Sequence, residues 1–141
     1  MTDAPETLGP DLPPVDDVTA PWWDATRERR LLVQRCESCG HLQHYPRALC
    51  TACGATDLGW DVASGRGTVD TFTVVHRPLP GFEPPYVVAR VRLAEGVVLL
   101  TNVVDVEPDG VRCDQAVRVS WRPLEDGRHL PVFTLVDGSA S

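Results

Sequence analysis

Short apolar runs separated by turn-forming residues fill most of the chain after residue 64. Five such runs, rich in β-branched and aromatic residues, lie at residues 68–76, 86–93, 97–104, 116–122 and 130–136. In the fourth run, Val117, Val119 and Trp121 alternate with polar side chains. An alternation with a period of two is typical of a strand that has one buried and one solvated face. The pattern therefore predicts five consecutive β-strands.

The segments between these strands contain the residues that turns require. Proline, glycine and acidic residues gather at residues 78–85, 94–96, 108–110 and 125–127. Strands joined by such turns would leave exposed sheet edges unless the sheet closes on itself. We therefore expect a mainly β protein in which residues 64–137 form a five-stranded antiparallel barrel of the OB-fold type, followed by a tail at 138–141.

The N-terminal segment carries a different pattern. Residues 1–20 combine four prolines with five acidic residues, a composition that buries too little apolar surface to offset the entropy of ordering. We expect these residues to form a mobile, disordered arm. Pro21 suits the first turn of a helix, and Thr19 or Ala20 could cap it. Residues 21–30 are accordingly predicted to be a short helix.

This helix has an aromatic face beside a basic one. Trp22 and Trp23 lie at its start, and Arg27 and Arg30 follow one turn or more later. The two indoles either pack on the chain's own domain or anchor a partner subunit. Packing on the chain's own domain is the favoured interpretation.

Two Cys-x-x-Cys-Gly motifs follow the helix, with ten residues between Cys39 and Cys50. Residues 31–35 and 42–46 read as strands that flank the first motif, and the ribbon closes near Trp60. Two residues between thiols let one tight turn aim both sulfurs at the same point, and the glycine that follows can take a positive φ. We expect a helix-plus-ribbon unit over residues 21–63 whose metal ligands are Cys36, Cys39, Cys50 and Cys53.

A site made of four thiolates determines what its metal can do. It leaves no open coordination position, so the ion stabilises structure and does not activate water. Zinc is favoured and iron is the alternative, because a lone ribbon without a visible redox partner has no evident use for electron transfer. Structural zinc contributes about 10–16 kcal/mol to folding, so the ribbon is expected to be unfolded without metal. The nearby His41 and His44 are expected to be bystanders.

Length, charge and the N-terminus exclude several classes of function. The chain has 141 residues and a net charge of −7, which opposes binding to the phosphates of nucleic acid. No apolar run approaches the roughly 20 residues that cross a bilayer, and the N-terminus lacks the basic and apolar segments of a secretory signal. We expect a cytoplasmic protein without a nucleic-acid or membrane partner. In the reducing cytoplasm, cysteines bind metal more often than they form disulfides.

The remaining reactive residues do not form a recognisable catalytic motif. No serine, cysteine or carboxylate has the sequence context of an activated nucleophile, so we expect no catalysis by this chain alone. His76 and His129 are expected to be structural groups, and the isolated Cys113 is expected to be a small buried side chain.

Two surface features could meet a partner. The loop at 77–82 is stiffened by prolines and could present Phe82 at a low entropic cost. Five arginines make the ribbon region basic, and they are either solvated or in contact with ligand phosphates or an acidic partner surface. They are Arg27, Arg29, Arg30, Arg35 and Arg47.

The order of helix, two-motif ribbon and barrel resembles the DUF35 family, which is described as acyl-CoA-associated OB-fold proteins with a rubredoxin-like zinc ribbon. The match covers nearly everything after Pro21. The residues that carry it are Arg35, Cys36, Cys39, Gly40, Pro46, Arg47, Cys50, Cys53, Gly54, Trp60 and segments 64–69, 72–78, 80–82, 85–89 and 130–133.

The resemblance implies an accessory role. It implies a non-catalytic subunit that binds and stabilises a thiolase-like protein of the sterol-carrier-protein thiolase type in a hetero-oligomer, in some members beside acyl-CoA and a hotdog-fold hydratase. The leading specific hypothesis is an aldolase complex for retro-aldol cleavage of a steroid side-chain β-hydroxyacyl-CoA. We expect the partner or acyl-CoA contacts among Trp22, Trp23, Arg27, Arg30, His76, Arg77 and Phe82.

Alternative functions remain open at this point. The partner could be another acyl-CoA thiolase or a hydratase. A ribbon joined to an OB fold could also bind single-stranded nucleic acid, which the negative charge opposes, or transfer electrons through iron. Because the sequence begins with its own arm and contains no hydratase domain, we expect either a free-standing subunit or an excised portion of a longer protein.

Overall fold

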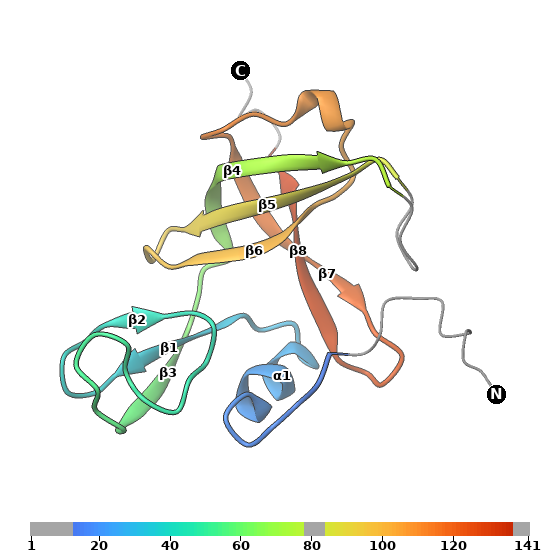
Figure 1. Cartoon of the computed structure of the whole chain (residues 1–141). Coiled ribbons are helices and arrows are strands. Elements are labelled where there is room, and N and C mark those ends of the chain that lie inside the picture. Colours follow the sequence, from blue (N-terminus) through green and yellow to red (C-terminus); the bar gives the residue numbers. More distant parts are fainter. Residues whose placement is uncertain (1–12, 78–83, 137–141) are drawn as a thin grey trace.

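The computed structural model describes residues 13–77 and 84–136. These residues form a short helix, a small three-stranded sheet and a closed barrel (Figure 1). The elements are α1 (Ala20–Thr26), β1 (Leu32–Cys36), β2 (Leu42–Gln43), β3 (Leu58–Val62), β4 (Arg66–Val75), β5 (Tyr86–Leu93), β6 (Val98–Val103), the 3-10 helix η2 (Pro108–Gly110), β7 (Ala116–Pro123) and β8 (His129–Leu135).

The five predicted barrel strands are confirmed, and each begins and ends within about two residues of the expected bounds. They close in the order β4-β5-β6-β8-β7. The strands pair antiparallel, as predicted, except at one seam, where β6 and β8 pair in parallel through Val103 and Phe133. A closed ring with an odd number of strands cannot alternate direction at every step, so one parallel pair is unavoidable.

The ribbon sheet has the order β2-β1-β3, and β1 pairs antiparallel with both neighbours. It lies beside the barrel and is joined to it by the short segment between β3 and β4 (Figure 1). The ribbon strands predicted from the sequence are present, although β2 is only two residues long.

The helix begins earlier and ends sooner than predicted. The N–H of Thr19 donates to Asp16 Oδ1 at 2.9 Å and the N–H of Asp16 donates to Thr19 Oγ1 at 3.1 Å, so ordered structure starts before the expected boundary at residue 20. The helix ends because Arg29 adopts a left-handed φ of 58° and the N–H of Arg30 donates to the carbonyl of Ala25. Residues 1–12, Phe82 and the tail at 138–141 lie outside the described residues.

The two tryptophans of α1 belong to the core, as the favoured interpretation predicted. Trp22 is 3% exposed and Trp23 is 4% exposed, and their rings meet edge to face at 4.7 Å. The indole N–H of Trp22 donates to the carbonyl of Leu32 at 2.9 Å. Both rings join one hydrophobic cluster that also includes the barrel interior around Val91 and Phe133.

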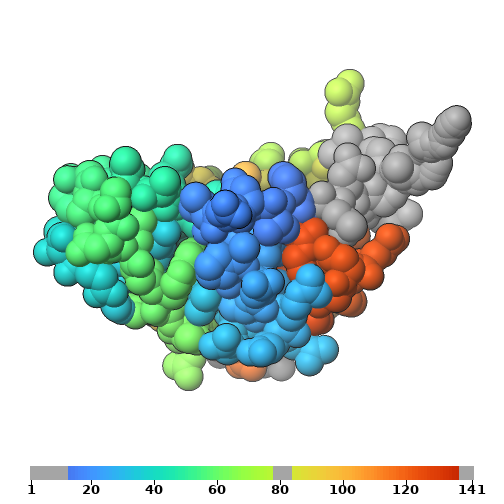
Figure 2. Space-filling model, turned by 90° about the horizontal axis from the view of Figure 1, so that it is seen from below, coloured from blue at the N-terminus to red at the C-terminus, as the bar shows by residue number. Residues whose placement is uncertain are grey.

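The helix also contacts the hairpin of β7 and β8. Figure 2 shows α1 in blue between the teal and green ribbon and the orange hairpin. The buried Thr26 Oγ1 donates to the carbonyl of Trp23 and accepts the N–H of His129, while His129 Nδ1 bonds the carbonyl of Thr26 at 2.8 Å. Arg128, 4% exposed, lies over the Trp23 ring and pairs with Asp126 at 2.6 Å. His129 thus has a structural role, as predicted.

Candidate metal centre

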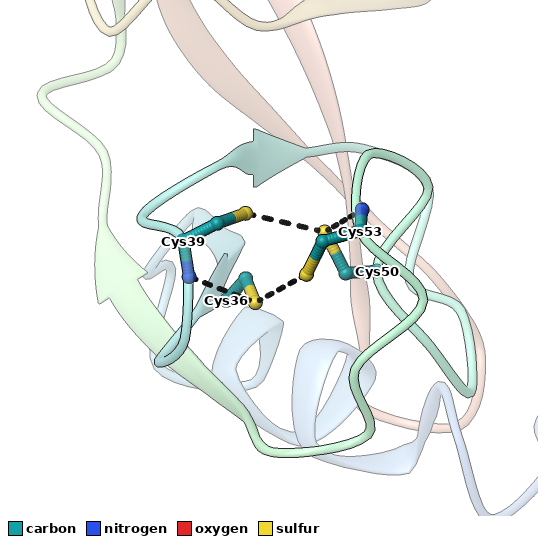
Figure 3. Close-up of side chains that lie close together, drawn as sticks. All are labelled: Cys36, Cys39, Cys50 and Cys53. Atoms are coloured by element: carbon teal, nitrogen blue, oxygen red, sulfur yellow. Dashed lines mark hydrogen bonds between the residues drawn. The ribbon is translucent and has the colours of Figure 1, made fainter.

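Two loops of the ribbon bring four sulfur atoms together. Cys36 ends β1 and Cys39 lies in the turn that follows, whereas Cys50 and Cys53 lie in the turns that precede β3. The four Sγ atoms all lie within 4.8 Å of one another, and they point toward a common centre (Figure 3). The structure therefore assembles the four predicted ligands into one cluster.

The spacing of the sulfurs fits a tetrahedral metal ion. The Sγ atoms of Cys36 and Cys53 are 3.6 Å apart, and those of Cys39 and Cys50 are 3.7 Å apart. Four zinc–sulfur bonds of about 2.3 Å in a tetrahedron would place the sulfurs about 3.8 Å apart. A disulfide would require about 2.05 Å, and all these cysteines are free thiols. The donor set and its size thus fit one four-coordinate ion.

The backbone around each cysteine pair is arranged to stabilise thiolates. The N–H of Cys39 donates to Cys36 Sγ at 3.4 Å, and the N–H groups of Ala52 and Cys53 donate to Cys50 Sγ at 3.3 and 3.4 Å. Such N–H···S contacts place positive dipole ends beside the sulfurs. Each loop then turns at the glycine after its second cysteine, where the N–H groups of Gly40 and Gly54 donate to the carbonyls of Cys36 and Cys50 at 2.9 Å.

Glycine makes that turn possible. Gly40 has a φ of 78° and Gly54 has a φ of 81°, a conformation that side chains with a Cβ adopt reluctantly. A Cβ at either position would meet nothing within 4 Å. The requirement for glycine therefore comes from backbone conformation and not from a lack of space.

The electrostatics of the cluster favour a bound cation. Burial raises the pKa of Cys50, but the N–H groups of Cys53 and Ala52 and the Cys39 thiol outweigh it and bring the pKa to about 6. The N–H of Ala55 lowers the pKa of Cys53, but the neighbouring thiols outweigh it and raise the pKa to about 12. One thiolate forms readily and its neighbours resist ionisation, because adjacent thiolates repel. A divalent cation would remove this repulsion.

A pair of glutamines, which sequence reasoning missed, positions the second cysteine loop. Gln34 and Gln43 are buried and face each other across β1 and β2, where the Gln43 amide donates to Gln34 Oε1 at 2.7 Å. Gln34 also bonds the N–H and the carbonyl of Arg47, and Gln43 bonds the carbonyl of Leu49 and the N–H of Thr51. The sequence offered one indication of this pair, because each of the two predicted ribbon strands contains a glutamine, at positions that face each other when the strands pair.

The other predicted contact residues do not form one site. Trp22 and Trp23 are buried, and Arg27 and Arg30 are exposed and paired with acidic residues of their own helix region. His76 and Arg77 are exposed where β4 ends, and Phe82 lies outside the described residues.

Cys113 is exposed, so the prediction of a buried side chain is wrong. It lies in a turn before β7 in which Asp114 has a φ of 70°. A turn at the surface offers no apolar enclosure to a small side chain, and no sequence pattern separates a surface thiol from a buried one.

An apolar hollow lies where ribbon, helix and barrel meet. It has a volume of about 420 Å³ and its lining includes Tyr45, Leu100 and Pro131. A second hollow of about 360 Å³ shares Leu100 and Pro131 and continues along the barrel toward Tyr86. His44 lines the first hollow, and burial lowers its pKa to about 4. With a neutral imidazole at its edge, the hollow is suited to apolar contact.

Comparison with protein families divides the chain in the same way as the structure. The family model described as the rubredoxin-like zinc ribbon domain of ChsH2 matches residues 23–59, and the C-terminal OB-fold domain of ChsH2 matches residues 60–122. Within the described residues, no helix is long and apolar enough to cross a bilayer.

Several curated proteins are similar over most of the chain. A probable enoyl-CoA hydratase alpha subunit of Thermomonospora curvata is 41% identical over 92% of this chain, which spans only 40% of that relative. A DUF35 domain-containing scaffold protein of Pyrococcus furiosus is 37% identical over 74% of this chain and 79% of its own length.

Two further relatives carry more specific names. The 3-oxo-4,17-pregnadiene-20-carboxyl-CoA hydratase alpha subunit of Mycobacterium tuberculosis is 33% identical over 89% of this chain and 41% of its own length. The benzoylsuccinyl-CoA thiolase subunit BbsA of Geobacter metallireducens is 29% identical over 71% of this chain and 68% of its own length.

A solved structure matches both halves of the fold together. A chain of the Ltp2-ChsH2(DUF35) aldolase superimposes with a TM-score of 0.82 and 39% identity, over 88% of this chain and 98% of that chain. Matches at this level, over both the cysteine ribbon and the barrel, show that the chain belongs to the DUF35 family of zinc-ribbon and OB-fold proteins.

Proposed function

We propose that this chain is a non-catalytic accessory subunit that binds and stabilises a thiolase-like acyl-CoA enzyme in a hetero-oligomer. The observation that carries the proposal is the similarity to a DUF35 chain in a structure named as an aldolase with a second component, Ltp2. A thiolase subunit and two scaffold-named relatives support the same class of role.

The more specific proposal concerns the reaction of the partner. We propose that the partner is an aldolase that cleaves a steroid side-chain β-hydroxyacyl-CoA by a retro-aldol reaction. It is supported by the aldolase name of the similar structure and by a relative named for a pregnadiene carboxyl-CoA substrate. The partner would supply the catalytic groups, and the present chain would supply a docking surface.

A second candidate is an association with a hydratase. Two relatives are named as alpha subunits of hydratases, and this chain corresponds to about two fifths of each. The remainder of those proteins has no counterpart here, so a hydratase would reach this chain as a separate partner or as a further domain.

We propose zinc as the ion held by Cys36, Cys39, Cys50 and Cys53. The sulfur spacing fits a tetrahedral ion, and the match to a zinc ribbon supports zinc over iron. The ion would be structural, because four protein ligands leave no position for water. The free cysteines of the chain also favour a reducing compartment, and we propose the cytoplasm.

Co-expression tests the proposal. The full chain and a thiolase-like protein of the same organism are produced together, and the complex is analysed by affinity purification and size-exclusion chromatography with light scattering. We expect one hetero-oligomer that contains zinc in equal number with this chain, and a higher melting temperature for the partner. Separate elution of the zinc-loaded chain from every thiolase-like protein of that organism would refute the proposal, and co-elution with a hotdog-fold hydratase instead would favour the second candidate.

A further inference from the structure

Three of the five arginines expected to make the ribbon region basic are paired with carboxylates within the chain. Arg35 pairs with Asp61 and with Glu37, Arg30 pairs with Glu28 at 3.2 Å, and Arg27 approaches Asp24 at 3.9 Å. These arginines have carboxylate partners close by in their own segments. The ribbon region is therefore a weak candidate for attracting an external negative charge.

A different set of arginines lies on the outer face of the barrel. The strand β4 runs between β5 and β7, and outward positions of all three strands carry arginine. We call this set the arginine face, and it consists of Arg66, Arg90, Arg92 and Arg118. All four side chains are exposed.

The sheet register places these charges next to one another. Arg66 pairs directly with Arg118 across β4 and β7, and directly opposed residues have Cβ atoms about 4.5–5.5 Å apart. Arg92 pairs with Thr68, two residues from Arg66 on the same face, which places it about 7–8 Å away on the diagonal. Arg90 continues the row, opposite Thr71.

Little negative charge within the described residues balances this row. Asp70 approaches both Arg90 and Arg92 at 3.5 Å and is shared between them. Asp105 borders the same hollow as Arg118 but forms no salt bridge with it, and Glu95, at the neighbouring hairpin, accepts the N–H of Ser64. Neither Arg66 nor Arg118 has a salt bridge among the described residues. Like charges directly opposed in a sheet destabilise it, so the charges of Arg66 and Arg118 do not stabilise the fold.

We propose that the arginine face is the docking surface for an acidic patch of the thiolase-like partner. This inference rests on the proposed function and adds the location and charge of the interface. The chain has a net charge of −7, but the arginine face carries an excess of positive charge. An acidic partner would therefore attract this face and turn it toward the interface. Complementary charge of this kind accelerates association and determines register.

The shape of the arginine face favours a protein surface over a phosphate group. The four arginines occupy register positions spread over three strands, and only Arg90 and Arg92 meet at a common group, the carboxylate of Asp70. A row of separate charges matches carboxylates spread over a partner's surface, and Arg binds each carboxylate through two parallel hydrogen bonds. The phosphates of CoA are the competing ligand, and the experiment distinguishes the two.

The test uses charge reversal at the directly opposed pair. Arg66→Glu/Arg118→Glu is compared with Arg29→Glu/Arg112→Glu, which changes the net charge equally at two exposed positions outside the arginine face. The affinities of each zinc-loaded full chain for free CoA and for the thiolase-like protein that co-purifies with the wild type are measured by calorimetry at 100 and 400 mM NaCl. Arg66→Gln/Arg118→Gln, which removes the repulsion, checks by its melting temperature that these positions tolerate substitution.

We expect the Arg66→Glu/Arg118→Glu variant to bind at least tenfold more weakly at 100 mM NaCl, and the Arg29→Glu/Arg112→Glu variant to bind within about twofold of wild type. The wild type should bind more weakly at 400 mM NaCl than at 100 mM. Equal affinity of all variants would overturn this inference and leave the proposed function standing. Absence of any complex with the wild type would overturn both. A variant that loses only the binding of free CoA would identify a phosphate site and also overturn the inference.

Discussion

At the scale of single residues, the ribbon depends on four sulfur atoms, each of which has a local reason for its position. Positive φ angles at Gly40 and Gly54 turn the two loops, and backbone N–H groups aim at the sulfurs of Cys36 and Cys50. Since a structural zinc contributes about 10–16 kcal/mol in total, each ligand accounts for roughly 3 kcal/mol.

Cys36→Ser is therefore expected to lower the affinity for zinc about 100-fold or more and to unfold the ribbon at metal concentrations that saturate the wild type. Zinc content by mass spectrometry and the circular dichroism spectrum measure the two effects. Cys113→Ser is the matched control, because this thiol is exposed and lies outside the cluster. A Cys36→Ser variant that kept one tightly bound zinc would show that the four sulfurs do not act together.

His44 provides a prediction about pH. Burial lowers its pKa from 6.5 to about 4, so the unfolded chain binds more protons than the folded chain between these values. The free energy of unfolding should consequently fall as the pH drops from 6.5 to 4, and this contribution should be complete and constant above pH 7. Because a pKa unit corresponds to about 1.4 kcal/mol and the ring is partly solvated, we expect a loss of about 1–3 kcal/mol.

Urea unfolding of wild type and His44→Gln across pH 4 to 8 measures this contribution. The variant lacks the imidazole, so the difference in stability between the two proteins should change through the window even though acid also protonates the metal ligands in both. Parallel pH curves for the two proteins would contradict the assignment of a half-buried, neutral His44.

At the scale of elements, close approach of strands selects glycine at the start of the barrel. A Cβ at Gly67 would lie 2.5 Å from the carbonyl oxygen of Arg92, which is backbone and cannot rotate away. This contact explains the second glycine of the Ser64-Gly65-Arg66-Gly67 segment. A side chain at residue 67 would collide with the backbone of β5, so β4 can approach β5 closely there only with glycine.

Gly67→Ala should therefore destabilise the protein by about 1–3 kcal/mol, because the added methyl group forces two paired strands apart. Gly110→Ala is the control, since its Cβ would meet its nearest neighbour at 3.6 Å, an ordinary contact. Thermal unfolding of both variants decides the point. Equal melting temperatures would mean that β4 and β5 adjust freely at this position.

The contact between α1 and the β7–β8 hairpin depends on Thr26. Its hydroxyl accepts the N–H of His129 at 3.2 Å and donates to the carbonyl of Trp23 at 2.6 Å in a fully buried environment. Thr26→Val keeps the shape and removes both bonds, and an unpaired buried donor costs about 1–3 kcal/mol.

Denaturant unfolding of Thr26→Val measures that cost, with Thr73→Val on the exposed face of β4 as the control. We expect the control to stay within about 0.5 kcal/mol of wild type. A comparable loss in both variants would indicate a general effect of replacing threonine and no special role for the helix contact.

At the scale of the whole molecule, ribbon and barrel share a core but differ in what holds them together. Trp22 and Trp23 connect the two units in one hydrophobic cluster, while the barrel closes by its own strand pairing. The ribbon has only short strands and relies on the metal cluster. Removal of the metal should consequently affect the two units differently.

Chelation at neutral pH is expected to remove hydrogen-exchange protection from β1 and β3 and to leave protection in β5 and β6. The apolar hollow should be lost with the ribbon, because Tyr45 and Arg47 line it from the loop between the cysteine motifs. Exchange measured by mass spectrometry, before and after zinc is restored, follows each strand separately. Simultaneous loss of protection in β5 and β6 would show that the ribbon and the barrel unfold as one unit.

Features with a local physical cause could be predicted from the sequence. The alternation at Val117, Val119 and Trp121 identifies a strand because side chains of a strand point to opposite faces in turn. The spacing of Cys36 and Cys39, repeated at Cys50 and Cys53, identifies a metal cluster because one tight turn is enough to direct each pair. Both depend only on neighbours within a few residues.

Other features depend on which distant segments meet, and only the tertiary structure decided them. The parallel seam between β6 and β8 follows from closing five strands into a ring. The pairing of Gln34 with Gln43 depends on the register of two strands, and so does the opposition of Arg66 and Arg118. Sequence pattern determined the elements and the ligands, whereas the partner of each polar or charged side chain was decided by the fold, because hydrogen bonds and ion pairs form between atoms that meet in space and not along the chain.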